Sequence, residues 1–91
     1  MTNVTYVIKM NKVEKAYMDG TFEGIDAATM YLNGTIILPA GSDLNEQLDK
    51  TAVAIYQRYL EAKEDDEEEA AYYMGYVYGF CKTTGVNLPE D

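Results

Sequence analysis

The feature that most constrains the fold is a long stretch, from Ser42 to Met74, that contains neither glycine nor proline. These residue types are the strongest breakers of helices, and apolar residues recur through the stretch at helical spacing. A single helix from here to residue 84 would be about 63 Å long, which is too long for a small domain. We therefore predict two helices, over 43–63 and 66–84, with a break near Asp65, because aspartate favours helix ends over helix interiors.

Capping residues support both predicted helices. Asp43 and Asp66 are each followed three residues later by a glutamate, which is the spacing of a capping box. The tyrosine-rich segment 71–80 also alternates as a strand would, but Gly85 suits the left-handed position that closes a helix. We therefore favour a helix there, followed by a C-terminal tail over 86–91.

The N-terminal part of the chain has the pattern of strands. Apolar and polar residues alternate from Val4 to Met10, as in a half-buried strand. Asp19-Gly20 and Asn33-Gly34 are residue pairs that two-residue hairpin turns prefer, and Gly24 suggests a bulge. The alternative for one part of this region is a short helix over 27–32, capped by Asp26.

These patterns together predict a single domain, residues 1–91, of the α+β class. Its first part, 3–38, is expected to form a four-stranded antiparallel β-meander. The two-helix hairpin is expected to pack on one face of that sheet, which is a way for a sheet and helices to share one core.

The charge of the chain limits its partners. The net charge is −9, and residues 42–91 account for −8 of it, with four bases against twelve acids. Such a field repels nucleic-acid phosphates and anionic lipid. We therefore expect no direct nucleic-acid binding and no membrane association, and a basic protein surface as the favoured partner.

Several other functions are disfavoured by composition. The chain has no histidine, the side chain that most often performs acid–base chemistry near neutral pH. Cys81 is the single cysteine, so the chain has no internal disulfide, and its apolar neighbours predict an inert buried thiol. The acidic run lacks the spacing of a calcium loop. We expect no enzymatic activity, no metal and no cofactor, and a soluble cytoplasmic protein, since no leader or membrane span is visible.

An acidic run that adjoins a tyrosine-rich segment is the most unusual surface feature. Aspartates and glutamates spread over two helices, with tyrosines among them, resemble the surface of DNA-mimic inhibitors, which place acids where duplex phosphates would lie. The resemblance concerns surface chemistry and implies no residue roles. The candidate partner-binding residues are Glu64, Asp65, Asp66, Glu67, Glu68, Glu69, Tyr72 and Tyr76.

Small residues mark a second feature of the same segment. Ala71, Gly75 and Gly79 recur every four residues, so they lie on one side of the predicted helix and permit another backbone to approach closely. The preceding helix, 43–63, is the expected occupant of this groove. The alternative is a seam for a homodimer or a partner.

The function that these features favour is protein binding. We expect an acidic protein that occupies a basic surface, in the manner of a phage-type inhibitor of a host nucleic-acid-processing enzyme. The alternatives are an assembly module that self-associates through the tyrosine- and glycine-rich helix, and a small-ligand-binding protein that uses the sheet and the tyrosines.

Overall fold

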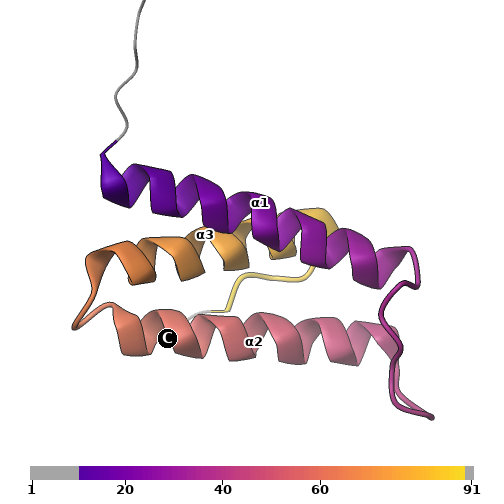
Figure 1. Ribbon diagram of the computed structural model, residues 1–91. Helices are drawn as coiled ribbons and strands as arrows, with labels where there is room; N and C mark the ends of the chain where they lie inside the picture. Colours follow the sequence, from indigo (N-terminus) through magenta and orange to yellow (C-terminus); the bar gives the residue numbers. More distant parts are fainter. Residues whose placement is uncertain (1–10, 90–91) are drawn as a thin grey trace, which may run out of the picture.

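The computed structural model describes residues 11–89 as three helices (Figure 1). They are α1 (Lys12–Leu32), α2 (Leu44–Ala62) and α3 (Glu67–Thr84). The last two agree with the helices predicted at 43–63 and 66–84 to within one residue at each end. No strand is present in this part of the chain.

The predicted α+β class is therefore wrong, and the fold is all-α. The meander expected over 3–38 is replaced by α1 and a coil segment that leads to α2. Its first strand, 4–10, lies outside the described residues. The alternative short helix over 27–32 forms the last part of α1.

Local signals at both ends explain why α1 is helical. Asn11 caps its start: the Asn11 side chain accepts a hydrogen bond from the Glu14 N–H (2.8 Å), and the Glu14 carboxylate accepts one from the Asn11 N–H (3.3 Å). At the other end Asn33 is the C-cap, and Gly34 has a φ of +77°. The Asn33-Gly34 pair thus ends a helix, because glycine adopts the left-handed conformation without strain.

The two glycines inside α1 are contact points with α3, which runs beside it (Figure 1). A methyl group at Gly20 would lie 2.8 Å from the carbonyl carbon of Tyr72, and one at Gly24 would lie 2.9 Å from that of Tyr76. Such distances are too short for any side chain. Asp19-Gly20 therefore lies within a helix rather than in the predicted turn, and Gly24 is not at a bulge, because both glycines allow two backbones to touch.

The contact is reciprocal and fixes the direction of the helices. A methyl group at Gly75 would lie 3.0 Å from the backbone nitrogen of Thr21, and one at Gly79 would lie 3.2 Å from the Thr21 carbonyl carbon. Contacts that advance along both helices together show that α1 and α3 are parallel. The short turn between α2 and α3 makes these two antiparallel.

Capping also defines α2 and α3. The Asp43 side chain accepts a hydrogen bond from the Asn45 N–H (3.3 Å), and the Asp66 side chain accepts one from the Glu69 N–H (3.1 Å). Gly85, at a φ of +82°, donates its N–H to the Cys81 carbonyl (2.8 Å). The predicted caps are therefore present, although Asp43 bonds one residue earlier than a capping box requires.

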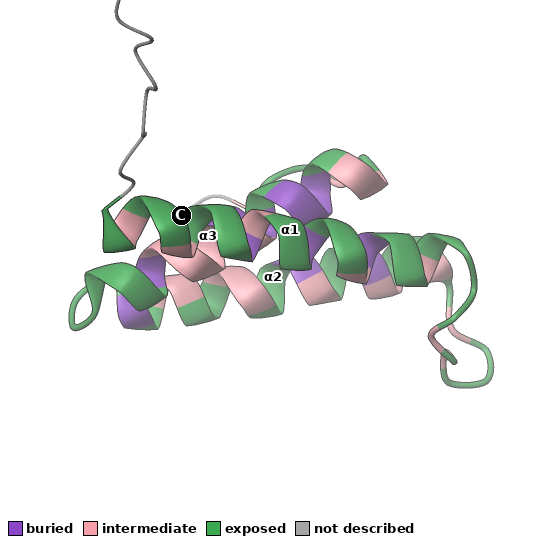
Figure 2. Ribbon diagram, turned by 45° about the horizontal axis from the view of Figure 1, so that its top comes forward, coloured by how far each residue is buried: buried purple, intermediate pink, exposed green. Residues whose placement is uncertain are grey.

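The core lies where all three helices meet, towards the C-terminal half of α3 (Figure 2). Phe80 and Val77 are its largest fully buried side chains. The Phe80 ring meets the Tyr31 ring edge-on, with centroids 5.9 Å apart, and the Tyr31 hydroxyl lies 3.1 Å from the Thr51 hydroxyl oxygen. The buried cluster is completed by Ala28, Leu48, Ala52 and Cys81.

Candidate functional site

The acidic turn, residues 64–69, joins α2 to α3 and forms the first turn of α3 (Figure 1). All six of its acids are exposed, and none of them forms an ion pair with another described residue. Three of them stand in the first turn of α3, where they complement the positive end of the helix dipole. The dipole therefore lowers part of the cost of collecting like charges, and the acids other than Asp66, which caps α3, remain free to meet a partner.

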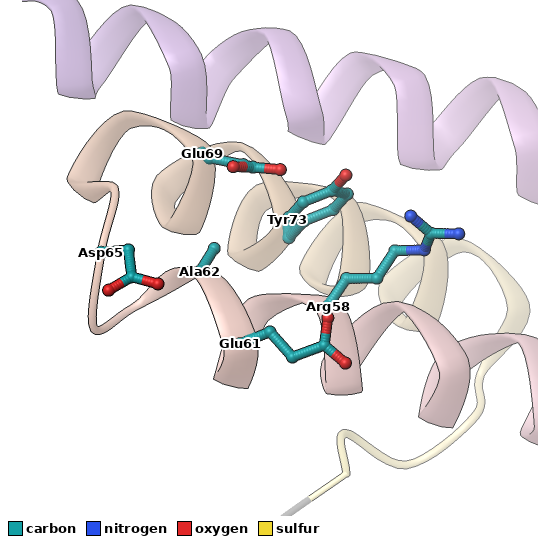
Figure 3. Close-up of a pocket in the computed structure, with 6 residues that line it drawn as sticks. All are labelled: Arg58, Glu61, Ala62, Asp65, Glu69 and Tyr73. Atoms are coloured by element: carbon teal, nitrogen blue, oxygen red, sulfur yellow. The ribbon is translucent and has the colours of Figure 1, made fainter.

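Beside this turn lies a pocket of about 170 Å³ (Figure 3). Asp65 and Glu69 line it from the turn, Arg58 and Glu61 line it from the last turns of α2, and the Tyr73 ring lies beside them. Residues 58–69 carry seven acids and two bases, a net charge of −5. The arrangement offers carboxylate acceptors and a phenol, which suit guanidinium or ammonium donors from a partner.

Tyr72, Tyr73 and Tyr76 of α3 form a half-buried row that continues from the acidic turn, whereas Tyr78 is exposed. The Tyr72 ring contacts the Tyr73 ring edge-on, with centroids 5.5 Å apart, and the Tyr76 ring at 6.2 Å. Partial burial, and then the nearby Glu23 carboxylate, raise the pKa of Tyr72; burial, and then Tyr72, raise the pKa of Tyr76. Both phenols therefore stay neutral donors at physiological pH.

The structure distributes the predicted site residues in two places. Residues 64–69 and Tyr72 lie together at one end of the bundle, and Tyr76 lies one turn further along α3. Gly75 and Gly79 are buried against α1, so the helix expected to fill their groove, 43–63, is not the one that does. Ala71 is half-buried at the edge of the same contact.

Sequence reasoning missed three contributors to the pocket that carry polar groups, Arg58, Glu61 and Tyr73. Arg58 lies on α2, seven residues before Asp65, and no motif marks it. Its position in the sequence could have indicated it. In an antiparallel helical hairpin, a side chain two turns before the end of the first helix lies level with the first turn of the second helix. Tyr73 lies half-buried at the pocket and was not among the candidate residues either.

Nothing in the described part of the chain assembles a metal site or a membrane span. Between residues 11 and 89, no three acidic or cysteine side chains converge in a way that could hold an ion. None of α1, α2 and α3 is both long and apolar enough to cross a bilayer.

Cys81 should react slowly with thiol reagents. Its side chain is 3% exposed, and burial, and then the Asp49 carboxylate, raise the pKa of its thiol. Because the thiolate is the reactive form, both effects slow alkylation at neutral pH. We expect labelling of the native protein by iodoacetamide to be far slower than labelling in denaturant. Equal rates in the two states would contradict the burial of Cys81.

Comparisons with protein-family models, with curated proteins and with solved structures found no match to this chain.

Proposed function

We propose that this chain is an acidic binding protein that occupies a basic surface of another protein through its acidic turn. The observation that carries the proposal is the exposed, unpaired state of residues 64–69 beside the Tyr73 pocket. The class of partner is a nucleic-acid-processing enzyme, whose phosphate-binding surface is basic. We place this activity in the cytoplasm.

The physical reason is that the acidic turn and the tyrosines beside it act at different stages of binding to a basic surface. Unpaired acids at one end of the molecule attract a basic surface over distance and so accelerate association. Tyr73 and Tyr72 then supply rigid side chains with polar tips, of the kind enriched where partners lose water on contact. The acids thus govern encounter, and the tyrosines govern the lifetime of the complex.

The small-residue seam does not support the assembly alternative. Gly75 and Gly79 are buried by α1 of the same chain, so they offer no open face to a second copy. The small-ligand alternative relied on a sheet, and residues 11–89 contain no strand.

Neutralising the acidic turn should slow binding. We expect the triple variant Glu67→Gln, Glu68→Gln, Glu69→Gln to associate with its partner roughly tenfold more slowly at low salt, because electrostatic steering typically contributes 10-fold or more. Its association rate should also depend less on salt. The partner is first captured from a host extract by the wild type, then purified for surface-plasmon-resonance kinetics at two ionic strengths.

The matched control removes three exposed acids elsewhere, with Asp26→Asn, Glu46→Gln and Asp49→Asn, which lie outside the acidic turn and away from Tyr72 and Tyr73 in the sequence. This variant has the same net charge as the first, so a similar slowing in both would mean that only total charge matters. Competition supplies the second arm: a short DNA duplex should displace the chain from its partner if both occupy one basic surface. If the glutamine triple keeps the wild-type rate and salt slope, the proposed role of the acidic turn is wrong.

A further inference from the structure

An apolar stripe on α1 is left uncovered by the rest of the described chain. It consists of Met18, Phe22 and Ile25, which are 41%, 59% and 37% exposed. Their spacing of four and then three residues places them on one side of the helix, as in the seam of a coiled coil. Within residues 11–89 this row contributes little to the core, since Phe22 is more than half exposed.

The stripe faces away from α2. Phe22 and Tyr31 are nine residues apart, or two and a half helical turns, so they lie on opposite sides of α1. Tyr31 belongs to the core, where its hydroxyl meets Thr51 of α2. Ile25 lies at the border with α3, because a methyl group at Gly79 would lie 3.3 Å from its Cγ1 atom.

A pocket continues the apolar surface at the N-terminal end of α1. It has a volume of about 390 Å³ and is lined by Val13, Glu14, Tyr17 and Met18 of α1 and by Ala71 of α3. At the other end of the same helix, Leu32 is 50% exposed. One end of α1 therefore offers an apolar hollow, and the other end offers an apolar side chain that projects.

We infer that the stripe binds the stripe of a second copy of this chain, with the two α1 helices antiparallel across a two-fold axis near Phe22. A two-fold interface must be complementary to itself. Here Phe22 meets its own counterpart, Met18 of each copy meets Ile25 of the other, and the hollow at one end of α1 faces the Leu32 end of its neighbour. This inference does not depend on the proposed function.

The charges of α1 favour the same orientation. Its first half carries Lys12 and Lys15 together with Glu14 and Asp19, so the net charge of that half is zero, and Lys15 pairs with Asp19 (2.9 Å). Its second half carries two acids, Glu23 and Asp26, and no base. Antiparallel pairing therefore sets each acidic half against a neutral half, whereas parallel pairing sets the two acidic halves side by side.

The positions of the two acidic turns favour antiparallel pairing more strongly. Glu68 lines a pocket with Lys12, Lys15 and Asp19, so the acidic turn lies beside the start of α1. In an antiparallel pair the two turns lie at opposite ends, separated by about the 31 Å length of a 21-residue helix. That separation is several times the Debye length of about 8 Å at physiological salt. Parallel pairing would place two strongly acidic turns side by side.

The test is the mass of the full chain in solution, measured by sedimentation equilibrium from about 1 μM to about 1 mM, the range in which a small interface dissociates. We expect a monomer–dimer equilibrium that strengthens with added salt, because both copies are acidic. Phe22→Glu should weaken it about 30-fold or more, as loss of a central anchor does. Val53→Glu is the control, since Val53 is 48% exposed but lies on α2.

The orientation is tested by oxidation of mixed cysteine variants. Met18→Cys mixed with Ile25→Cys should give mainly the mixed disulfide, whereas a parallel pair would give the two self-disulfides; buried Cys81 stays out of the reaction in a wild-type control. A monomer at every concentration overturns the inference, whether the stripe then serves another protein or another segment of this chain. A dimer that survives Phe22→Glu, or one that forms self-disulfides, also overturns it.

Discussion

Gly24→Ala should lower the free energy of unfolding by about 3 kcal/mol, since overpacking a tight contact typically costs 1–3 kcal/mol or more. The added methyl group would lie 2.9 Å from the carbonyl carbon of Tyr76 and 3.0 Å from the backbone nitrogen of Phe80. Both neighbours are backbone, so neither can rotate away, and α1 and α3 must separate. The same change at an open helical position would stabilise the protein by about 1 kcal/mol, because alanine is the better helix former.

Whether Gly24→Ala lowers or raises the free energy of unfolding therefore shows whether α1 and α3 touch at Gly24. Chemical denaturation followed by circular dichroism measures it, with Ala54→Gly as the control: Ala54 is exposed on α2, and its replacement tests helix propensity alone, which costs about 1 kcal/mol. A gain of stability for Gly24→Ala would show that α1 and α3 do not touch at this point. A domain of 91 residues has roughly 5–14 kcal/mol in total, so a loss of 3 kcal/mol is readily measured.

Phe80→Ala should cost about 3–5 kcal/mol, the usual range for removing a fully buried phenylalanine. The Phe80 side chain is 0% exposed and sits in the cluster that joins all three helices, against the Tyr31 ring. Its loss removes apolar contact and leaves a cavity between elements that have little other shared core. We expect a large drop in the thermal midpoint, measured by calorimetry.

The chain supplies its own control, because it contains just one other phenylalanine. Phe22 is 59% exposed, so Phe22→Ala should change the stability of the monomer little. The comparison is made at the lowest concentration that gives a signal, where dimerisation does not contribute. Similar losses for the two variants would mean that the core is not centred on Phe80.

The sequence predicted the second and third helices well because their signals are local. Caps such as Asp66 and Gly85, and the absence of glycine and proline from Ser42 to Met74, act within a few residues of the chain. The exposed acids needed no tertiary information either, since a run of six charges cannot be buried. For α1 the local signals conflicted: Asp19-Gly20 and Asn33-Gly34 favour turns in isolation.

The contact between α1 and α3 outweighs these local preferences for turns, and one pattern in the sequence could have predicted that contact. Gly20, Gly24 and Ala28 have the same four-residue spacing as Ala71, Gly75 and Gly79. Two matching rows of small residues predict two helices that touch, and only the second row was recognised. The pocket was harder to foresee, because Arg58 and Glu69 line the same pocket only through the geometry of the α2–α3 turn.

The parallel contact between α1 and α3 also has a consequence for the order of folding. Gly20 meets Tyr72, which is 52 positions further along the chain, whereas α2 and α3 are joined by a turn of four residues, 63–66. Closing a long loop costs more entropy than closing a short one, and contacts between distant positions form late. We therefore expect the α2–α3 hairpin to form before α1 docks on it. In that order of folding, Gly75 and Gly79 line an open groove on α3 until the backbone of α1 covers them, so we expect the folding chain to expose this groove before it is complete.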